Sequence, residues 1–262
     1  MRLIILAAGQ GTRLGSLTED RPKALVPLAG RPLIDWTLDA AAEAGLDEIV
    51  VVGGHRIDRL ADLPVALLEN PEYATTNMVQ TLFRAEACFG DGFVVSYGDI
   101  AYRPAVLAAV LASTASIAVA IDLDWRSYWE ARFGDPLRDA ESLRLQADGS
   151  IAEIGQVVDR IEDVQGQYIG LVAFRGAGVD ALRSTWDRAL TDAAAGRPVL
   201  GRRPDLRRLY MTDILDELAA THPVAAVPIH GDWVEIDTPR DLDVAETRWA
   251  ESVSPPTPIR AA

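Results

Sequence analysis

The sequence predicts an α/β protein with a Rossmann-like, three-layer αβα arrangement and a mixed, mainly parallel sheet. Three observations predict this class: short apolar runs alternate with amphipathic segments, 49% of the 262 residues are hydrophobic, and a glycine or carboxylate follows several apolar runs. A chain of this length and composition can bury one large core with a small appended lobe. Ligands of such sheets gather at the carboxyl ends of the strands.

The order of the elements follows from hydrophobic periodicity. Short apolar runs predict strands, and apolar residues three and four positions apart predict helices. The predicted strands are 2–8, 48–52, 65–69, 93–97, 116–122, 168–174 and 224–228. The predicted helices between them are 33–44, 77–89, 104–112, 178–190 and 212–220.

The alternation breaks between residues 122 and 167, where charged and aromatic residues dominate. A hairpin is predicted at 143–146 and 151–154, because the intervening Asp148-Gly149 is typical of a tight turn. We interpret 122–167 as an inserted lobe within one domain, 1–250, followed by a proline-rich, disordered tail at 251–262. The segment 196–208 carries five arginines without an apolar period and is either a solvated loop or a lid.

Charge and hydropathy exclude several classes of partner. The formal net charge is −14 at pH 7, whereas nucleic acids and anionic lipid surfaces require a basic face. No apolar run is long enough to span a membrane and no signal-peptide pattern opens the chain, so we expect a cytoplasmic protein. The surface of helix 178–190 would suit a homodimer. A small anionic ligand would need a divalent metal or a local cluster of Arg and Lys.

A glycine loop follows the first predicted strand. The run reads Leu6-Ala7-Ala8-Gly9-Gln10-Gly11-Thr12-Arg13, and Lys23 lies eleven residues after Thr12. Backbone amides in such a loop can face a triphosphate, while Arg13 and Lys23 supply positive charge. Leu14 replaces the third glycine of a dinucleotide-binding turn and the P-loop motif is absent, so neither NAD nor Walker-type ATP binding is supported.

Two strand-end carboxylates lie far apart in the sequence. Asp99 follows Gly98 at the end of the run 93–97, and Asp237 lies in Trp233-Val234-Glu235-Ile236-Asp237-Thr238-Pro239. Mg²⁺ prefers few protein carboxylates together with substrate phosphate oxygens, so Asp99 and Asp237 favour half of a magnesium shell. The alternative interpretation of each residue is a turn or helix cap.

Residues 3–34, Gly98-Asp99 and 233–242 together resemble the signature of the sugar-phosphate and alcohol-phosphate nucleotidyltransferases. Members of this family join a nucleoside monophosphate to a phosphorylated acceptor and release pyrophosphate. The resemblance, which spans about residues 2 to 246, implies Mg²⁺ on Asp99 and Asp237, with Glu235 as an alternative or additional ligand. We assign Lys23 to the α-phosphate, and Arg13 with the amides around Gly11 to the β- and γ-phosphates.

The segment 70–82 is dense in amides and hydroxyls that can read a base edge, although Thr76 or Asn77 can equally be a helix cap. It resembles the corresponding segment of cytidylyltransferases acting on phosphocholine and 2-aminoethylphosphonate, which implies CTP as the donor. The expected nucleotide-binding residues are Leu6, Ala7, Ala8, Gly9, Gly11, Thr12, Asn70, Thr76, Asn77, Thr81 and Gly98.

The inserted lobe is expected to bind the acceptor. Arginines there suit an anionic group, and aromatic rings with carboxylates suit an ammonium, but Trp125 and Trp129 can instead form the core stripe of a helix. The family usually has a lysine where this chain has Gln156, so that contact loses charge assistance, for which Arg160, Arg126 or Arg132 can compensate. The expected acceptor-binding residues are Asp122, Asp124, Trp125, Arg126, Tyr128, Trp129, Arg132, Glu141, Gln156 and Tyr168.

Two other functions stay open at this stage. A sugar-1-phosphate or cyclitol-phosphate nucleotidyltransferase would stack its ring on the aromatics of 122–141. A catalytically silent nucleotide-binding regulator on the same fold is favoured by Gln156 and disfavoured by the presence of Lys23, Asp99 and Asp237.

Overall fold

The structure is a computed structural model that describes residues 1–251. The predicted tail, 251–262, lies outside the described residues except for Glu251, which ends helix α7 (Pro239–Glu251). In the described residues, no helix combines the length and apolar character needed to cross a membrane.

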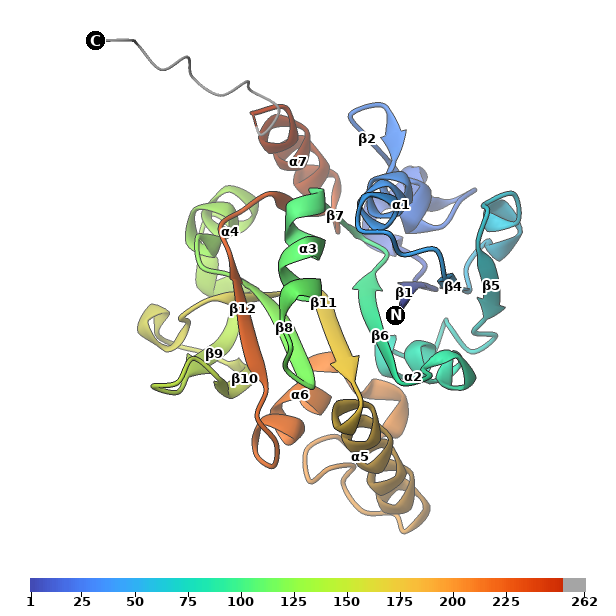
Figure 1. The fold of residues 1–262 in the computed structure, drawn as a ribbon. Helices are drawn as coiled ribbons and strands as arrows, with labels where there is room; N and C mark the ends of the chain where they lie inside the picture. Colours follow the sequence, from blue (N-terminus) through green and yellow to red (C-terminus); the bar gives the residue numbers. More distant parts are fainter. Residues whose placement is uncertain (252–262) are drawn as a thin grey trace.

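A seven-stranded sheet forms the centre of the molecule, in the order β12-β8-β11-β6-β1-β4-β5 (Figure 1). Only β11 runs antiparallel to its neighbours, β6 and β8, while the other adjacent pairs are parallel. The predicted mixed, mainly parallel sheet is therefore confirmed. Its strands are β1 (Arg2–Ala7), β4 (Ile49–Gly53), β5 (Ala66–Glu69), β6 (Gly92–Tyr97), β8 (Ile117–Asp122), β11 (Gln167–Arg175) and β12 (Ala225–Ile229).

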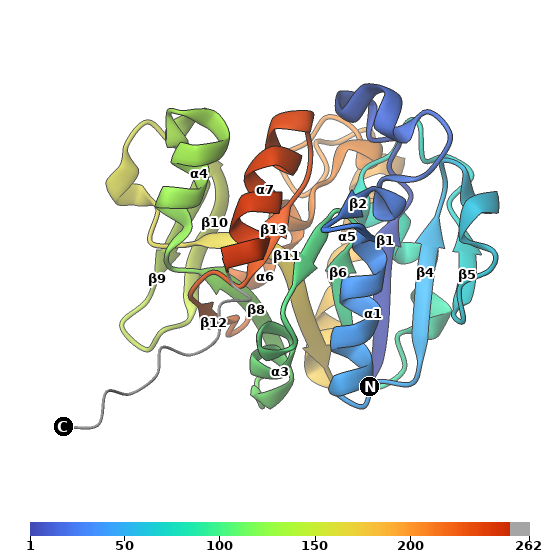
Figure 2. The ribbon, with the colours of Figure 1, turned by 90° about the horizontal axis from the view of Figure 1, so that it is seen from above.

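Helices cover both faces of the sheet (Figure 2). Side chains alternate along a strand, so Leu3 and Ile5 of β1 join one buried cluster and Ile4 and Leu6 join the other. The first cluster includes apolar residues of α1 (Leu33–Glu43) and α3 (Pro104–Ala112). The second includes residues of α2 (Met78–Phe83), α5 (Ala177–Ala194) and α6 (Met211–Ala219). The predicted three layers are thus present. The apolar face of α5 packs inward, and the homodimer stays a prediction.

The predicted helix 77–89 is shorter than expected. Helix α2 ends at Phe83 and a 3-10 turn follows at Glu86–Cys88. The chain bends here because Phe89 enters the core, where its ring stacks on Phe93 with the ring centres 4.2 Å apart.

Residues 123–166, between β8 and β11, form helix α4 (Trp125–Phe133) and a hairpin of β9 (Glu141–Leu145) and β10 (Ile151–Val157). The two hairpin strands are antiparallel, as predicted. Outside this segment, β2 (Pro27–Leu28) pairs with β3 (Arg31–Pro32), and β7 (Ile100–Tyr102) pairs with β13 (Trp233–Glu235). The β7–β13 pair is the element that brings the second carboxylate segment to the edge of the main sheet.

Candidate active site

Three segments far apart in the sequence meet at the carboxyl ends of β1 and β6. The amide of Gly98 donates to the carbonyl of Leu6 at 2.9 Å, and the amide of Ile236 donates to the carbonyl of Asp99 at 3.0 Å. Carboxylate oxygens of Asp99, Glu235 and Asp237 consequently lie within 4.8 Å of one another. The two strand-end acids predicted from the sequence are therefore together in space.

Gly98 permits this approach because it has no side chain. An added Cβ would lie 2.8 Å from the carbonyl oxygen of Leu6 and 3.0 Å from the Cα of Ala7. Both contacts are with backbone, so the neighbouring strand would have to move.

Gly98→Ala is expected to lower the free energy of unfolding by about 1–3 kcal/mol, the usual cost of overpacking a core. Denaturant unfolding followed by circular dichroism measures this change. Gly9→Ala is the matched control, since its added methyl would meet no atom within 4 Å. Equal stability of the two variants would contradict the expectation.

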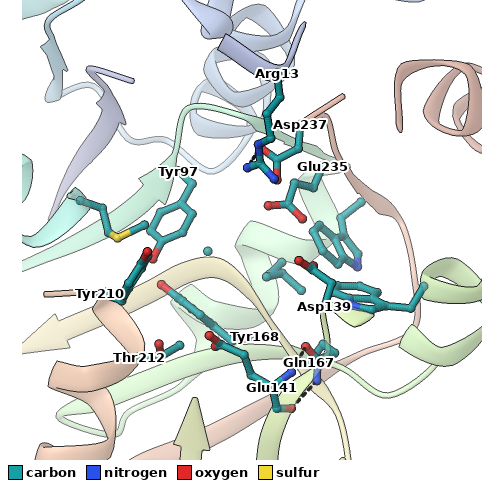
Figure 3. Close-up of a pocket in the computed structure, with 15 residues that line it drawn as sticks. Arg13, Tyr97, Asp139, Glu141, Gln167, Tyr168, Tyr210, Thr212, Glu235 and Asp237 are labelled. Atoms are coloured by element: carbon teal, nitrogen blue, oxygen red, sulfur yellow. Dashed lines mark hydrogen bonds and ion pairs between the residues drawn. The ribbon is translucent and has the colours of Figure 1, made fainter. Parts of the chain in front are cut away.

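Two basic side chains face the acid cluster. The ammonium of Lys23 lies 2.8 Å from Oδ2 of Asp99 and also bonds Oδ1 of Asp237. The guanidinium of Arg13 lies 3.1 Å from the same Asp237 oxygen, and Figure 3 shows it beside Asp237 and Glu235 at one end of a cavity. The Lys23 side chain is only 13% exposed. It therefore points into the site, as its proposed role requires.

The glycine loop owes its path to Gly11. This residue adopts a left-handed conformation, φ 63°, and precedes the 3-10 turn Thr12–Thr18, a geometry that glycine adopts at little cost. Thr18 donates its hydroxyl hydrogen to the Gly11 carbonyl at 2.8 Å, which fixes the loop above the sheet edge.

Burial and charge act against each other on the ionisable groups of the cluster. Burial lowers the pKa of Lys23, but the charges of Asp99, Asp237 and Glu235 outweigh this and hold the pKa above its ordinary value. Burial, reinforced by Asp237 and Asp99, raises the pKa of Glu235 to about 7 despite the nearby charge of Arg132. The pKa of Asp237 is lowered because Lys23 and the arginines overcome the effect of burial.

The acid cluster fits a divalent cation. Oδ1 of Asp99 is buried and has no hydrogen-bond partner among the described residues. A buried carboxylate oxygen without a partner is costly, and a hard cation would satisfy it. Asp99 and Asp237 are the residues that would hold the ion, with Glu235 as an alternative or additional ligand.

Arg132 lies beneath the cluster and not in the cavity. Its side chain has no exposed surface and pairs with Glu235, Asp241 and Asp237. It is consequently unavailable to an anionic acceptor, which corrects the expectation from the sequence.

A cavity of about 230 Å³ opens beside the acid cluster. Figure 3 shows Arg13, Asp237 and Glu235 at one end and Glu141 at the opposite end, with Tyr97 and Tyr210 along one side. Its other lining residues include Met78, Trp129, Asp139, Gln167, Tyr168, Thr212 and Trp233. Arg13 is the single basic residue of this lining in the described part of the chain.

A second cavity adjoins the first, and Met78 and Tyr97 line both. It brings together the two segments expected to bind the nucleotide, because its lining includes Leu6, Ala8, Gly9, Thr76, Asn77, Thr81 and Asp99. Several of the residues predicted to bind the nucleotide therefore lie around one cavity.

Asn70 and Asn77 organise this second cavity. The buried Asn70 amide donates to the hydroxyls of Thr76 at 3.1 Å and Thr81 at 3.0 Å. Asn77 occupies the N-cap position of α2, but its side chain makes no cap bond and donates instead to the Arg208 carbonyl at 3.1 Å. The arginine-rich segment is thereby attached to the base-binding segment.

Several predicted acceptor ligands lie away from the first cavity. Asp122 is buried and accepts from the Trp233 indole at 2.9 Å. Trp125 is buried in the core, Asp124 faces His230 on the surface, and Arg126 pairs with Glu130. These four residues make contacts within the protein, and the burial of Trp125 agrees with the alternative core-stripe interpretation.

Tyr128 and Gln156 are also occupied by contacts within the protein. The Tyr128 hydroxyl accepts from the Glu235 amide at 2.8 Å. Gln156 donates to Asp216 at 3.1 Å, and Arg202 pairs with the same carboxylate. Arg160 is exposed and lies near Glu162, so it too is engaged at the surface. Of the predicted acceptor set, Trp129, Glu141 and Tyr168 line the cavity.

The predicted site residues did not include Tyr97, Asp139, Gln167, Tyr210 and Thr212, which line the first cavity. Tyr97 directly precedes the Gly98-Asp99 motif, and this position in the sequence could have identified it as a lining residue. The others enter through tertiary contacts that no local pattern indicates.

The fold and the cluster of Lys23, Asp99 and Asp237 define a nucleotidyltransferase. The chain belongs to the family described as the MobA-like NTP transferase domain, which matches residues 3–227. This assignment confirms the family class and the enzymatic class predicted from the sequence.

Two curated relatives match almost the whole chain. The CTP:phosphoglutamine cytidylyltransferase of Campylobacter jejuni subsp. jejuni is 34% identical over 257 residues, which are 93% of this chain and 98% of the relative. The CMP-5'-(3-aminopropyl)phosphonate synthase of Streptomyces rubellomurinus is 30% identical over 262 residues, which are 95% of this chain and 39% of that protein.

Among solved structures, the CTP:phosphocholine cytidylyltransferase of Streptococcus pneumoniae superposes with a TM-score of 0.72 at 21% identity. The match covers 95% of this chain and 98% of the other. It shows that the two proteins share the fold.

Proposed function

We propose that this enzyme transfers CMP from CTP to a small phosphonate or alcohol phosphate, of the 2-aminoethylphosphonate or phosphocholine type, and releases pyrophosphate in a Mg²⁺-dependent reaction. The observation that carries the proposal is the convergence of Lys23, Asp99 and Asp237 between a base-side and an acceptor-side cavity. The names of the two curated relatives, both of which handle CTP or CMP, support the choice of nucleotide.

The reaction needs anions to be held together more than it needs proton transfer. The second pKa of a phosphate monoester is about 6, so the acceptor oxygen is already ionised near neutral pH and attacks the α-phosphorus without a general base. The bond from the α-phosphorus to the bridging oxygen breaks, and the electron pair leaves with pyrophosphate. Bound Mg²⁺ supplies charge neutralisation to the triphosphate.

The chain's own residues then have distinct tasks. Lys23 binds an oxygen of the α-phosphate, where negative charge develops during the transfer. Arg13 and the backbone amides around Gly11 orient the β- and γ-phosphates for in-line displacement. Asp99 and Asp237 hold the ion, and the aromatic walls of the first cavity enclose the head group of the acceptor.

A panel of substrates tests this function. We expect pyrophosphate release with CTP in preference to UTP, dTTP, ATP and GTP, when the acceptors offered are aminophosphonates, phosphocholine and sugar phosphates. EDTA is expected to abolish the release and excess Mg²⁺ to restore it, because the triphosphate would lose its counter-charge. Phosphate release coupled to a pyrophosphatase measures the rate.

Other outcomes identify the alternatives. A preference for sugar or cyclitol phosphates would indicate ring stacking on aromatic side chains such as Trp129. Tight CTP binding with every acceptor inactive would favour a regulator on the same fold.

A further inference from the structure

Helix α4 presents one face to β13 and to the segment after it, which carry Glu235 and Asp237. Trp125, Tyr128, Trp129 and Arg132 are spaced three and four residues apart and are all buried. The Tyr128 hydroxyl accepts from the Glu235 amide at 2.8 Å and donates to the Glu235 carbonyl at 3.1 Å. Trp129 of the same face lines the acceptor-side cavity. One helix therefore contacts both the cavity and the acid cluster.

Arg132 makes the central polar contacts of this face. Its guanidinium donates to Oε2 of Glu235 at 2.6 Å and to Oδ1 of Asp241 at 2.9 Å, and it lies 3.7 Å from Oδ2 of Asp237. The other oxygen of Asp241 accepts from the backbone amides of Asp237 at 3.2 Å and Thr238 at 2.8 Å. Arg132 and Asp241 together fix the turn from which the Asp237 side chain projects.

The three acids of the cluster differ in their basic partners. Asp99 and Asp237 face Lys23 and Arg13 at the cavity, whereas Glu235 is paired with a guanidinium that has no exposed surface. A planar guanidinium can bind two carboxylates at once, which an ammonium cannot do with the same geometry.

We propose that Arg132 is a positioning residue, which neutralises Glu235 and orients Asp237 so that the ion is held chiefly by Asp99 and Asp237. The assignment rests on the proposed function of the site. It makes the geometry of the acid cluster dependent on a helix of the acceptor lobe.

Arg132→Gln tests this role through metal binding in the absence of nucleotide. Without the guanidinium, Glu235 is free to ligate, so Mn²⁺ binding measured by electron paramagnetic resonance is expected to tighten roughly fivefold or more. The kcat for pyrophosphate release is expected to fall about tenfold or more because Asp237 loses its orientation, with the KM for CTP changed by less than about twofold.

Tighter metal binding together with slower turnover distinguishes positioning from loss of structure, which would weaken both. Weaker Mn²⁺ binding, or an unchanged kcat, would overturn the proposal. Arg144→Gln on the exposed hairpin of the same lobe, whose partner is Asp163, is the matched control and should leave Mn²⁺ binding, kcat and KM unchanged.

Arg132→Lys keeps the proposal testable if Arg132→Gln does not fold. It retains a buried cation opposite the acids but cannot bridge Glu235 and Asp241, so kcat is expected to fall about threefold or more with the KM for CTP unchanged. A kcat within experimental error of the wild type would overturn the proposal. If the wild type forms no pyrophosphate with any acceptor, the proposed function fails, while Mn²⁺ binding by the variants still tests Arg132.

Discussion

Lys23→Ala is expected to lower kcat by roughly 10²- to 10³-fold, the range found when one preorganised donor to developing charge is removed. The ammonium is held toward the reacting centre by Asp99 and Asp237, and no other lysine lies in the sequence. The fold should persist, because Arg13 still pairs with Asp237 at 3.1 Å. Steady-state pyrophosphate release and thermal unfolding measure the two quantities.

The control for this variant is Arg21→Ala on the same loop. Arg21 is exposed and pairs only with its neighbour Asp20 among the described residues, so its loss should change kcat little. Near-normal turnover of Lys23→Ala would remove Lys23 from the proposed role at the α-phosphate.

Asp99→Ala is the second variant with a large expected effect. One of the two acids proposed to hold the ion would be lost, so kcat should fall roughly 10²- to 10³-fold and raised Mg²⁺ should recover only part of it. A Mg²⁺ titration of the initial rate measures both quantities. The chain should remain folded because Asp99 is 24% exposed and its removal leaves a space open to the cavity.

Asp124→Ala is the matched control, since that exposed carboxylate faces only His230 among the described residues. If Asp99→Ala responded to Mg²⁺ as the wild type does, Asp99 would not be a metal ligand.

The main sheet was predictable because a buried strand consists of a short run of mostly apolar residues, which is visible in the sequence. The run 2–8 is apolar after Arg2, and the run 93–97 is apolar except for Ser96. The residue at the end of each strand reaches the sheet edge in any arrangement of this class. Asp99 and the glycine loop could therefore be placed from the sequence. Asp237 lies two residues after β13, the short strand that pairs with β7, and its position followed from the motif that surrounds it.

The acceptor lobe was less predictable because its polar residues turn inward toward distant partners. Arg132 finds Asp241 and Asp122 finds Trp233, each more than 100 residues away along the chain. In the sequence, these charged and polar side chains cannot be distinguished from side chains that bind a ligand. Gln156 likewise bonds Asp216, 60 residues away. The packing of α4 against β13 and α7, and of β10 against α6, determines which of these polar groups are structural.

The ring of Tyr97 restricts the shape of a molecule that occupies both cavities. It borders both cavities and lies where a Cβ on Gly170 would come within 2.7 Å of it, while the Tyr168 ring stands edge-on at 5.8 Å. Gly170 and Tyr168 therefore pack against the ring, which lies between the two cavities. Under the proposed function, a nucleotide product that occupies both cavities has to pass around the edge of this ring.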